Sequence, residues 1–317
     1  MPRPTSGTTI QRPDLQQAID EYVDEQDAFI GLKVAPTVEV LHQAADYPII
    51  PIEALLSIPD TKRAPRGHYA RSDWDFEMDT YSCSENGFEE VIDDVEVNLY
   101  SRYFDVEQIC AKRAMGIVLR NQEKRIADMV FNTANFTEVS PTHEWDDAAN
   151  AVPMTDVKLG HIAIKNATGL RANTLIISWS TFLDLGINAQ ILDRIKYTNP
   201  GVSRGELSPA MLALAFEVDQ VLVGGGRYNT AKKGQTASLA DIWSNEYAML
   251  CRVENGPDIT QPCLVRTFLW TADSPTNVVV ESYREDQSRG DVIRIRHNTD
   301  EEFIIPDCGY LMDNITT

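Results

Sequence analysis

The stretch FDVEQICAKRAMGIVLRNQEKRIADMVFN, residues 104–132, predicts one long helix. Asp105 is a good N-cap because its carboxylate can accept backbone N–H groups of the first turn, and Gln108 fits a capping box. Apolar residues then follow helical spacing in two stripes, which indicates that two partners pack on the helix. The stripes are Val106, Ile109, Cys110, Ala114, Ile117 and Val118, and Met115, Leu119, Ile126 and Val130. Such a helix would be roughly 40 Å long, which suits a spine with other elements packed across it.

The middle of this spine is polar, with the run RNQEKR at residues 120–125. We interpret this run as a solvated turn of the helix, with an inter-subunit ion-pair site as the alternative. The apolar positions predict that the spine packs on strands near the end of the chain. The residues expected to make this contact are Ile109, Cys110, Ile117 and Val118.

Length, charge and cysteine usage limit the class of protein. The 317 residues can bury a substantial core, in two domains or in one domain with large extensions. A net charge of −20 excludes a protein that grips nucleic acid by neutralising phosphates, although such a surface can still enclose DNA. The five cysteines are scattered without a C-x-x-C pair, so we expect neither disulfides nor a thiolate zinc site. Without an apolar run of about 18 residues, a soluble intracellular protein is expected.

The first residues predict an extended arm with a short amphipathic helix. Asp14 is its N-cap, and Leu15, Ile19 and Tyr22 lie on one face. So short a helix is marginal alone, so this face must dock on its own chain or on a neighbouring one. We expect these three apolar residues to contact another subunit.

A long excursion follows from residue 47. Its tip is rich in turn residues and bases, and the next stretch, DWDFEMD at residues 73–79, alternates acidic and apolar residues as a strand with one acidic face does. Such a hairpin buries little by itself, so we expect it to lie on another subunit; a surface hairpin covering its own domain is the alternative. The inter-subunit residues expected here are Lys62, Arg63, Arg66, Arg71, Trp74, Asp75, Phe76, Glu77 and Met78.

The rest of the chain divides into two patterns. Short strands alternate with short helices over residues 169–253, which predicts an inserted α/β module. Beyond Pro262 the chain is almost all strand, with segments at 265–270, 278–283, 291–297 and 303–305. These strands need a helix to cover them, and the spine is the obvious candidate. The predicted fold class is therefore α+β, with one domain split in sequence by the module.

The order of these parts resembles the major capsid proteins of tailed bacteriophages, whose fold was first seen in the Hong Kong ninety-seven phage and is shared with encapsulin shells. The resemblance covers nearly the whole chain and is sharpened by local stretches that are packing and turn motifs rather than chemical ones. They are ANTLII at 172–177, DRIKYT at 193–198, VGGGRYNTA at 223–231, SYR at 282–284 and GYL at 309–311.

The resemblance implies a domain plan. The plan is an N-terminal arm at 1–46, an extended E-loop at 47–87, a peripheral domain at 88–160 with the spine helix, an axial domain at 161–261, and closing peripheral strands at 262–317. It implies a structural, non-enzymatic subunit that forms pentamers and hexamers in an icosahedral shell around double-stranded DNA, in a virion assembled in the host cytoplasm. Expected partners are other copies of the chain, a portal and decoration proteins. No membrane association is expected. Because no extra N-terminal block precedes the arm, a separate scaffolding protein is expected too.

Alternative functions start from particular residues. An encapsulin-type nanocompartment is the alternative within the fold. The turn of Gly224, Gly225 and Gly226 after a strand suggests an enzyme that binds a phosphorylated ligand, but its spacing fits neither nucleotide motif, so we expect glycines that permit positive φ, near a symmetry axis. A calcium loop starting at Asp73 would lack its glycine, and Lys62 could form an isopeptide crosslink but is more simply a solvated tip lysine. We predict no catalytic residue, metal or cofactor.

Overall fold

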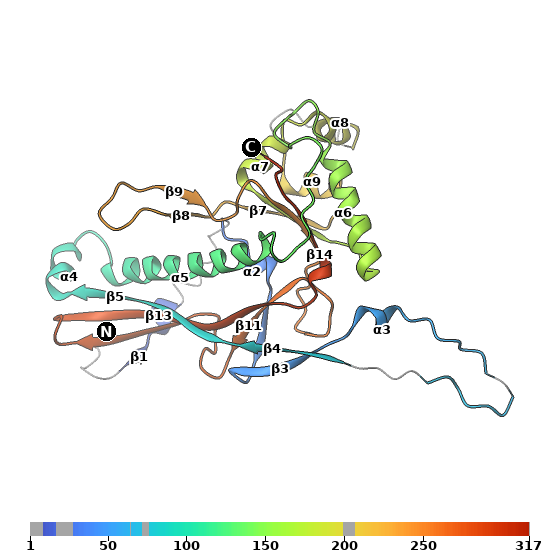
Figure 1. Ribbon diagram of the computed structural model, residues 1–317. Helices are drawn as coiled ribbons and strands as arrows, with labels where there is room; N and C mark the ends of the chain where they lie inside the picture. Colours follow the sequence, from blue (N-terminus) through green and yellow to red (C-terminus); the bar gives the residue numbers. More distant parts are fainter. Residues whose placement is uncertain (1–8, 17–27, 64, 72–75, 199–206, 317) are drawn as a thin grey trace.

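The computed structural model describes residues 9–16, 28–63, 65–71, 76–198 and 207–316. These residues form a sheet-and-helix unit, an α/β unit stacked above it, and a loop that leaves the first unit as an extended arm (Figure 1). We call the first the peripheral unit, built on the sheet β1-β12-β13-β11-β2 with β5 and covered by α5. The second is the axial unit, built on the sheet β14-β10-β6-β7 with α6 to α9.

Strand β13 (Gly290–Phe303) organises the peripheral sheet. Its first half pairs with β12 (Val279–Glu285) and its second half with β11 (Val265–Trp270), both antiparallel. Along its other side β13 pairs with β5 (Ser84–Asp93). The predicted strand at 291–297 is therefore part of a longer strand, which also takes in Phe303, whereas residues 304 and 305 of the predicted strand at 303–305 lie beyond its end. Between its two partners on one side, His297 and Asn298 stay paired with β5 on the other.

The N-terminal part of the chain extends this sheet at both edges. β1 (Ile10–Gln11) pairs with β12, and β2 (Thr37–Val40) runs parallel to β11. Shorter elements elsewhere are α2 (Gly31–Val34), α3 (Ile52–Leu56), α4 (Asp94–Tyr100), β8 (Arg227–Asn229), β9 (Leu239–Asp241) and the 3-10 helix η1 (Pro306–Cys308).

Helix α5 (Val106–Val130) is the predicted spine and crosses β5 and β13 (Figure 1). Its start is confirmed, because the Asp105 carboxylate accepts the backbone N–H groups of Glu107 and Gln108 at 3.1 and 3.3 Å. Its 25 residues give a length of about 37 Å. The side chains that pack between the helix and the sheet are Ala111, Ala114, Met115, Val118 and Leu119 with Ile92, Val278, Val280, Ile293 and Ile295.

The packing face of the spine differs in part from the prediction. Val118 is buried as expected, but Ile109 is 46% exposed and does not pack on the closing strands. Cys110 is half-buried and packs on the cluster that includes the closing strands, as predicted, and Ile117 is half-buried. The small side chain of Ala111 lets the helix approach the sheet closely, so the face that carries it is the buried one and Ile109 lies outside it.

The polar middle of the spine is not a solvated turn. Gln122 and Glu123 are 2% and 3% exposed, so that interpretation is wrong for both. Arg125 forms an ion pair with Glu301 of β13 at 2.9 Å, within the same subunit. The spine therefore contacts the sheet through polar side chains as well as apolar ones.

The axial unit has the predicted α/β character. β6 (Thr174–Ser178) pairs in parallel with β7 (Gln220–Gly224), and antiparallel with β10 (Ala248–Cys251). A parallel connection needs a long crossover, which is usually helical, and the described part of this one contains helices. They are α7 (Trp179–Leu185), α8 (Ala189–Thr198) and α9 (Pro209–Phe216).

The boundary of the axial unit differs from the predicted domain plan at two places. Helix α6 (Pro153–Thr168) crosses the boundary drawn after residue 160. It packs on β10 and β14. β14 (Gly309–Met312) was expected in the peripheral domain, but it pairs with β10 at the edge of the axial sheet. Leu311 and Met312 of this strand are fully buried, which explains why it closes the axial core.

Candidate functional site: surfaces for assembly

The base of the long loop is fixed to the peripheral unit. β3 (Ala44–Ile49) and β4 (Glu77–Ser82) pair antiparallel and carry the loop between them. The Tyr47 hydroxyl donates to the carbonyl oxygen of Phe303 at 3.2 Å, and the backbone N–H of Ser82 donates to the Asp300 carboxylate at 2.6 Å. Contacts to the sheet thus hold both strands, so the excursion starts from a rigid support.

The base of the loop is acidic. Burial, together with the neighbouring Asp300 and Asp79 carboxylates, raises the pKa of Glu302 to about 7. Burial also raises the pKa of Asp300 itself, although the Ser82 N–H opposes this rise. Several carboxylates therefore share a small space where the loop leaves the sheet.

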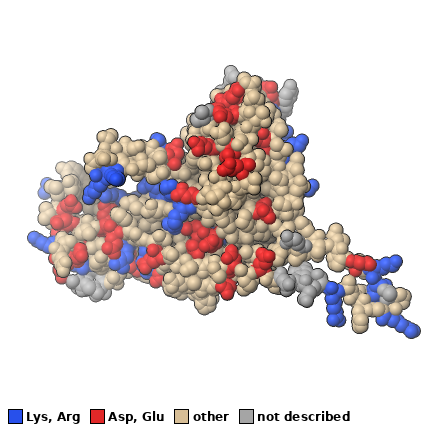
Figure 2. All heavy atoms as spheres, in the orientation of Figure 1, with Lys and Arg blue, Asp and Glu red and all other residues tan. Residues whose placement is uncertain are grey.

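The tip of the loop is basic and projects far from both units. Figure 1 shows it as an extended arm and Figure 2 shows basic side chains gathered there. Lys62, Arg63, Arg66 and Arg71 are all exposed, as their predicted role requires. The Arg63 side chain donates to the carbonyl oxygen of Gly67 at 2.7 Å. The tip is thus a positive surface on a strongly negative chain.

The apolar row of the loop is exposed within one subunit. Phe76 is 57% and Met78 61% exposed, and Glu77 between them is exposed as well. Trp74 and Asp75, the other two predicted residues of this strand, lie outside the described residues. The row thus offers apolar area that its own chain leaves uncovered.

The N-terminal arm is docked on its own chain where it is described. Leu15 is 3% exposed and lies in the cluster with Ile92 and Met115, so its prediction as an inter-subunit contact is wrong. The reason is that β1 pairs with β12 and places the next residues over the sheet. Arg12 adds ion pairs to Asp14 and to Glu107 of the spine, each at 2.8 Å. The predicted contacts Ile19 and Tyr22 lie outside the described residues.

Glu123 joins three parts of the chain that are distant in sequence. Its Oε1 accepts the backbone N–H of Ile30 at 2.8 Å and the indole N–H of Trp243 at 2.6 Å, and its Oε2 accepts the N–H of Gly31 at 2.5 Å. A side chain at Gly31 would collide with this carboxylate. Burial raises the pKa of Glu123, and the three donors oppose that rise. The spine, the end of the N-terminal arm and the loop before β10 are thereby held at one point.

Sequence reasoning missed this residue, although a signal was present. Glu123 continues the spacing of Met115 and Leu119 in the second stripe of the spine, four residues beyond the latter and three before Ile126. A charged residue in line with an apolar stripe indicates either a break in the stripe or a buried group with dedicated partners. Glu123 is the second case, because Ile30, Gly31 and Trp243 donate hydrogen bonds to it.

The glycine turn is required by close packing and not by backbone conformation. None of Gly224, Gly225 and Gly226 has a positive φ, so the predicted reason is wrong. A Cβ on Gly224 would overlap the indole of Trp243, and the N–H of Gly225 donates to the carbonyl oxygen of Ala28 at 3.3 Å. The turn leads into strand β8 instead of a helix N-terminus, so it lacks the cradle of a phosphate-binding loop.

Among the described residues, no group of three or more His, Cys, Asp or Glu side chains is arranged to hold a metal ion. No helix in the same ranges is long and apolar enough to cross a membrane.

Similar sequences point to one kind of protein. No protein-family model matches the chain. The major capsid protein of Burkholderia phage BcepMu is 26% identical over 294 residues, covering 90% of this chain and 91% of that protein. The major capsid protein of Pseudomonas phage JBD67 is 20% identical over 291 residues, with the same coverage.

Similar solved structures share the fold over nearly the whole chain. A phage-related protein from Bordetella bronchiseptica RB50 matches with a TM-score of 0.73 and 21% identity, over 97% of this chain and 98% of that one. The capsid of cyanophage P-SCSP1u matches with a TM-score of 0.57 and 12% identity, over 88% and 86%. An encapsulin from Synechococcus elongatus PCC 7942 matches with a TM-score of 0.50 and 11% identity, over 90% and 86%.

The fold therefore does not separate phage shells from encapsulin shells, but the similar sequences are phage proteins. The long loop, the spine over the split sheet and the inserted α/β unit agree with that relationship. The chain is thus similar to the major capsid proteins of phages and has the Hong Kong ninety-seven-type fold, and it is a structural, non-enzymatic protein of the virion capsid.

Proposed function

We propose that this capsid protein forms pentamers and hexamers that close into an icosahedral shell around double-stranded DNA. The observation that carries the proposal is the long loop, whose base is fixed by Tyr47 and Ser82 while its apolar row and basic tip are exposed. A two-stranded excursion of this kind is marginal on its own. Its natural support is a neighbouring subunit.

The forces on the loop can be ranked by size. Covering Phe76 and Met78 on a neighbour contributes about 1.5 to 3 kcal/mol each before the cost of ordering the loop. Exposed ion pairs of the basic tip contribute at most about 1 kcal/mol each. The apolar row therefore supplies most of the affinity, and the tip charges guide the approach to an acidic neighbour.

We expect Phe76→Ala with Met78→Ala to raise the protein concentration needed for half-maximal assembly by about 10- to 100-fold, because the apolar area covered on the neighbour is lost. The subunit itself should fold normally, since both side chains are exposed in it. Sedimentation and negative-stain microscopy measure the assembly, and a thermal melt of the unassembled subunit measures the fold.

The matched control is Asp75→Asn with Glu77→Gln, which removes charge from the same stretch of sequence. It should shift only the salt concentration at which shells form. If Phe76→Ala with Met78→Ala forms normal shells while Asp75→Asn with Glu77→Gln forms none, electrostatics and not apolar contacts hold the loop.

The charge of the chain bears on its cargo and on its partners. At −20 the subunit repels DNA, so we propose that the shell encloses the DNA without sequence-specific binding. The same charge opposes self-association, so a separate scaffolding protein is proposed to assist assembly. A portal and decoration proteins are further proposed partners.

A further inference from the structure

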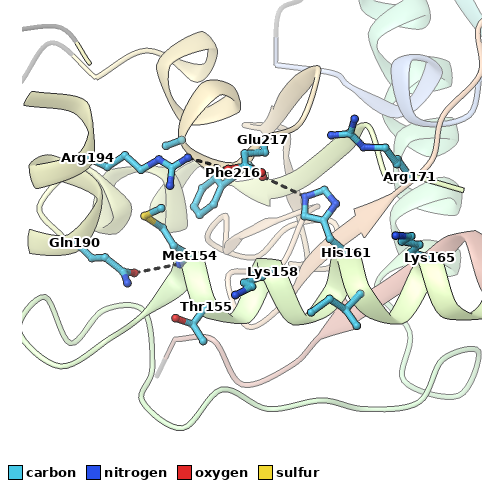
Figure 3. Close-up of a pocket in the computed structure, with 12 residues that line it drawn as sticks. Met154, Thr155, Lys158, His161, Lys165, Arg171, Gln190, Arg194, Phe216 and Glu217 are labelled. Carbon is cyan, nitrogen blue, oxygen red and sulfur yellow. Dashed lines mark hydrogen bonds and ion pairs between the residues drawn. The ribbon is translucent and has the colours of Figure 1, made fainter. Parts of the chain in front are cut away.

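A groove with basic sides runs along one face of α6 in the axial unit. It is a cavity of about 610 Å³ between α6, α8 and the end of α9. Figure 3 shows Lys158 and Lys165 rising from α6, with Arg194 and Arg171 across the space. Of the residues that line it, only Glu217 is acidic, and Arg194 pairs with it at 2.9 Å. The groove is therefore positive on a chain whose net charge is −20.

The floor of the groove is apolar. Met154, Ile162 and Phe216 line it between the basic side chains. The opposite face of α6 is packed on the axial sheet, where a Cβ at Gly160 would lie 2.7 Å from the Tyr310 ring. Since the inner face of α6 is already occupied, the groove face is available to another molecule. Its chemistry fits a partner that is apolar along its centre and acidic at its sides.

A surface of that kind lies on α7 of the same unit. Trp179, Leu183 and Ile187 are each more than half exposed. Trp179 and Leu183 lie four residues apart in one row on α7, and Ile187 follows in the turn after the helix ends. Asp184 lies beside this row, and Asp146 is close enough that it adds to the effect of burial in raising the pKa of Asp184. We call this row with its two acids the α7 ridge.

The groove and the ridge lie on opposite sides of the axial unit. In Figure 1, α7 is on one side of the unit and α6 is on the other, the side towards which the long loop extends. Figure 2 shows acidic side chains over the visible face of the axial unit and basic ones at the edge beside α6. Two different, complementary surfaces on one chain produce head-to-tail contacts, and such contacts form a ring when the rotation from one subunit to the next closes.

We propose that the α6 groove of one subunit receives the α7 ridge of a second copy of this chain in the same ring. The proposal rests on the ring assembly proposed above and names the surfaces that meet. The neighbour that supports the loop lies on the α6 side, so the groove faces that same neighbour. Nucleic acid would match the basic sides but not the apolar floor, and it would leave the ridge uncovered.

The test reverses charge on each face in turn. The groove variant carries Lys158→Glu with Lys165→Glu, and the ridge variant carries Asp146→Lys with Asp184→Lys. In each variant, like charges face each other across the contact. At low salt, half-maximal particle formation should therefore need at least about tenfold more protein than for the unaltered chain. Gradient sedimentation with negative-stain microscopy gives the particle yield, and a thermal melt checks the fold.

The chain that carries all four substitutions should assemble again within about threefold of the unaltered concentration, because opposite charges then meet once more. The matched control is Lys232→Glu with Lys233→Glu between β8 and β9, which changes the net charge as the groove variant does. It should assemble as the unaltered chain does.

The outcomes separate the two proposals. If the unaltered chain forms no particles under any condition, the ring assembly itself is contradicted. If the unaltered chain forms particles, and the folded variant with all four substitutions does not regain particle formation, the pairing of groove with ridge is wrong. An equal loss in the groove variant and in the Lys232 and Lys233 control would assign the effect to net charge, which also overturns the pairing.

Discussion

Replacement of Glu123 by alanine is expected to destabilise the unassembled subunit by about 3 kcal/mol or more. The substitution removes the acceptor from three buried donors, the N–H groups of Ile30, Gly31 and Trp243. Each donor left without a partner costs about 1 to 3 kcal/mol, since none can reach water at a side chain that is 3% exposed. Urea unfolding followed by tryptophan fluorescence measures the free energy, and Trp243 reports on the site directly.

Two further variants make this measurement specific. Glu123→Gln keeps one oxygen for two of the donors but turns an NH₂ group towards the third, so its loss should be smaller than that of alanine. Asp128→Ala on the same helix removes only an exposed pair with Lys124 and should cost less than about 0.5 kcal/mol. A loss for Glu123→Ala no larger than for Asp128→Ala would show that the carboxylate does not hold these parts together.

Acidification is expected to destabilise the subunit through His297 by about 3 kcal/mol between pH 7 and pH 4. This histidine of β13 is fully buried, and neither ring nitrogen has a hydrogen-bond partner among the described residues. Burial lowers its pKa to about 4, with a further lowering by Arg125 and an opposing effect of Glu301. The folded state therefore binds the proton less readily than the unfolded state, whose histidine has a pKa of about 6.5.

The sign follows from which state takes up the proton. Below about pH 6.5 the unfolded chain is protonated first, so stability falls as the pH falls through the folded pKa of about 4 and levels off below it. His297→Leu removes this titration. The unfolding free energy of the unaltered chain minus that of the variant should therefore fall by about 3 kcal/mol from pH 7 to pH 4. A difference that stays constant over this range would mean that His297 is not buried as a neutral group.

The outcome for particular elements shows where sequence reasoning succeeds. The spine begins at the predicted N-cap, and β11 spans the predicted residues 265–270. The resemblance to phage capsid proteins agrees with the similar sequences and structures. These features depend on residues that are close together in the chain, or on an order of parts that is visible along it.

Other features could not be read in this way. The spine buries the side that carries Ala111, although Ile109 is the more hydrophobic residue, because the smaller side chain allows closer contact with the sheet. Leu15 packs on its own peripheral core and β14 joins the axial sheet, because each completes an apolar surface formed by distant segments.

By itself the sequence determined the N-cap and length of the spine, the strand-rich pattern beyond Pro262, the acidic charge and the exposed basic tip, since each follows from local spacing or from composition. Only the tertiary structure decided which face of the spine is buried, where the last strand pairs, and that Glu123 is a buried junction. Its partners Ile30 and Trp243 lie 93 and 120 residues away. From the sequence, a carboxylate is predicted to be exposed, because a charge has a lower free energy in water than in the protein interior. Only folding brings together the three donors that stabilise the buried carboxylate.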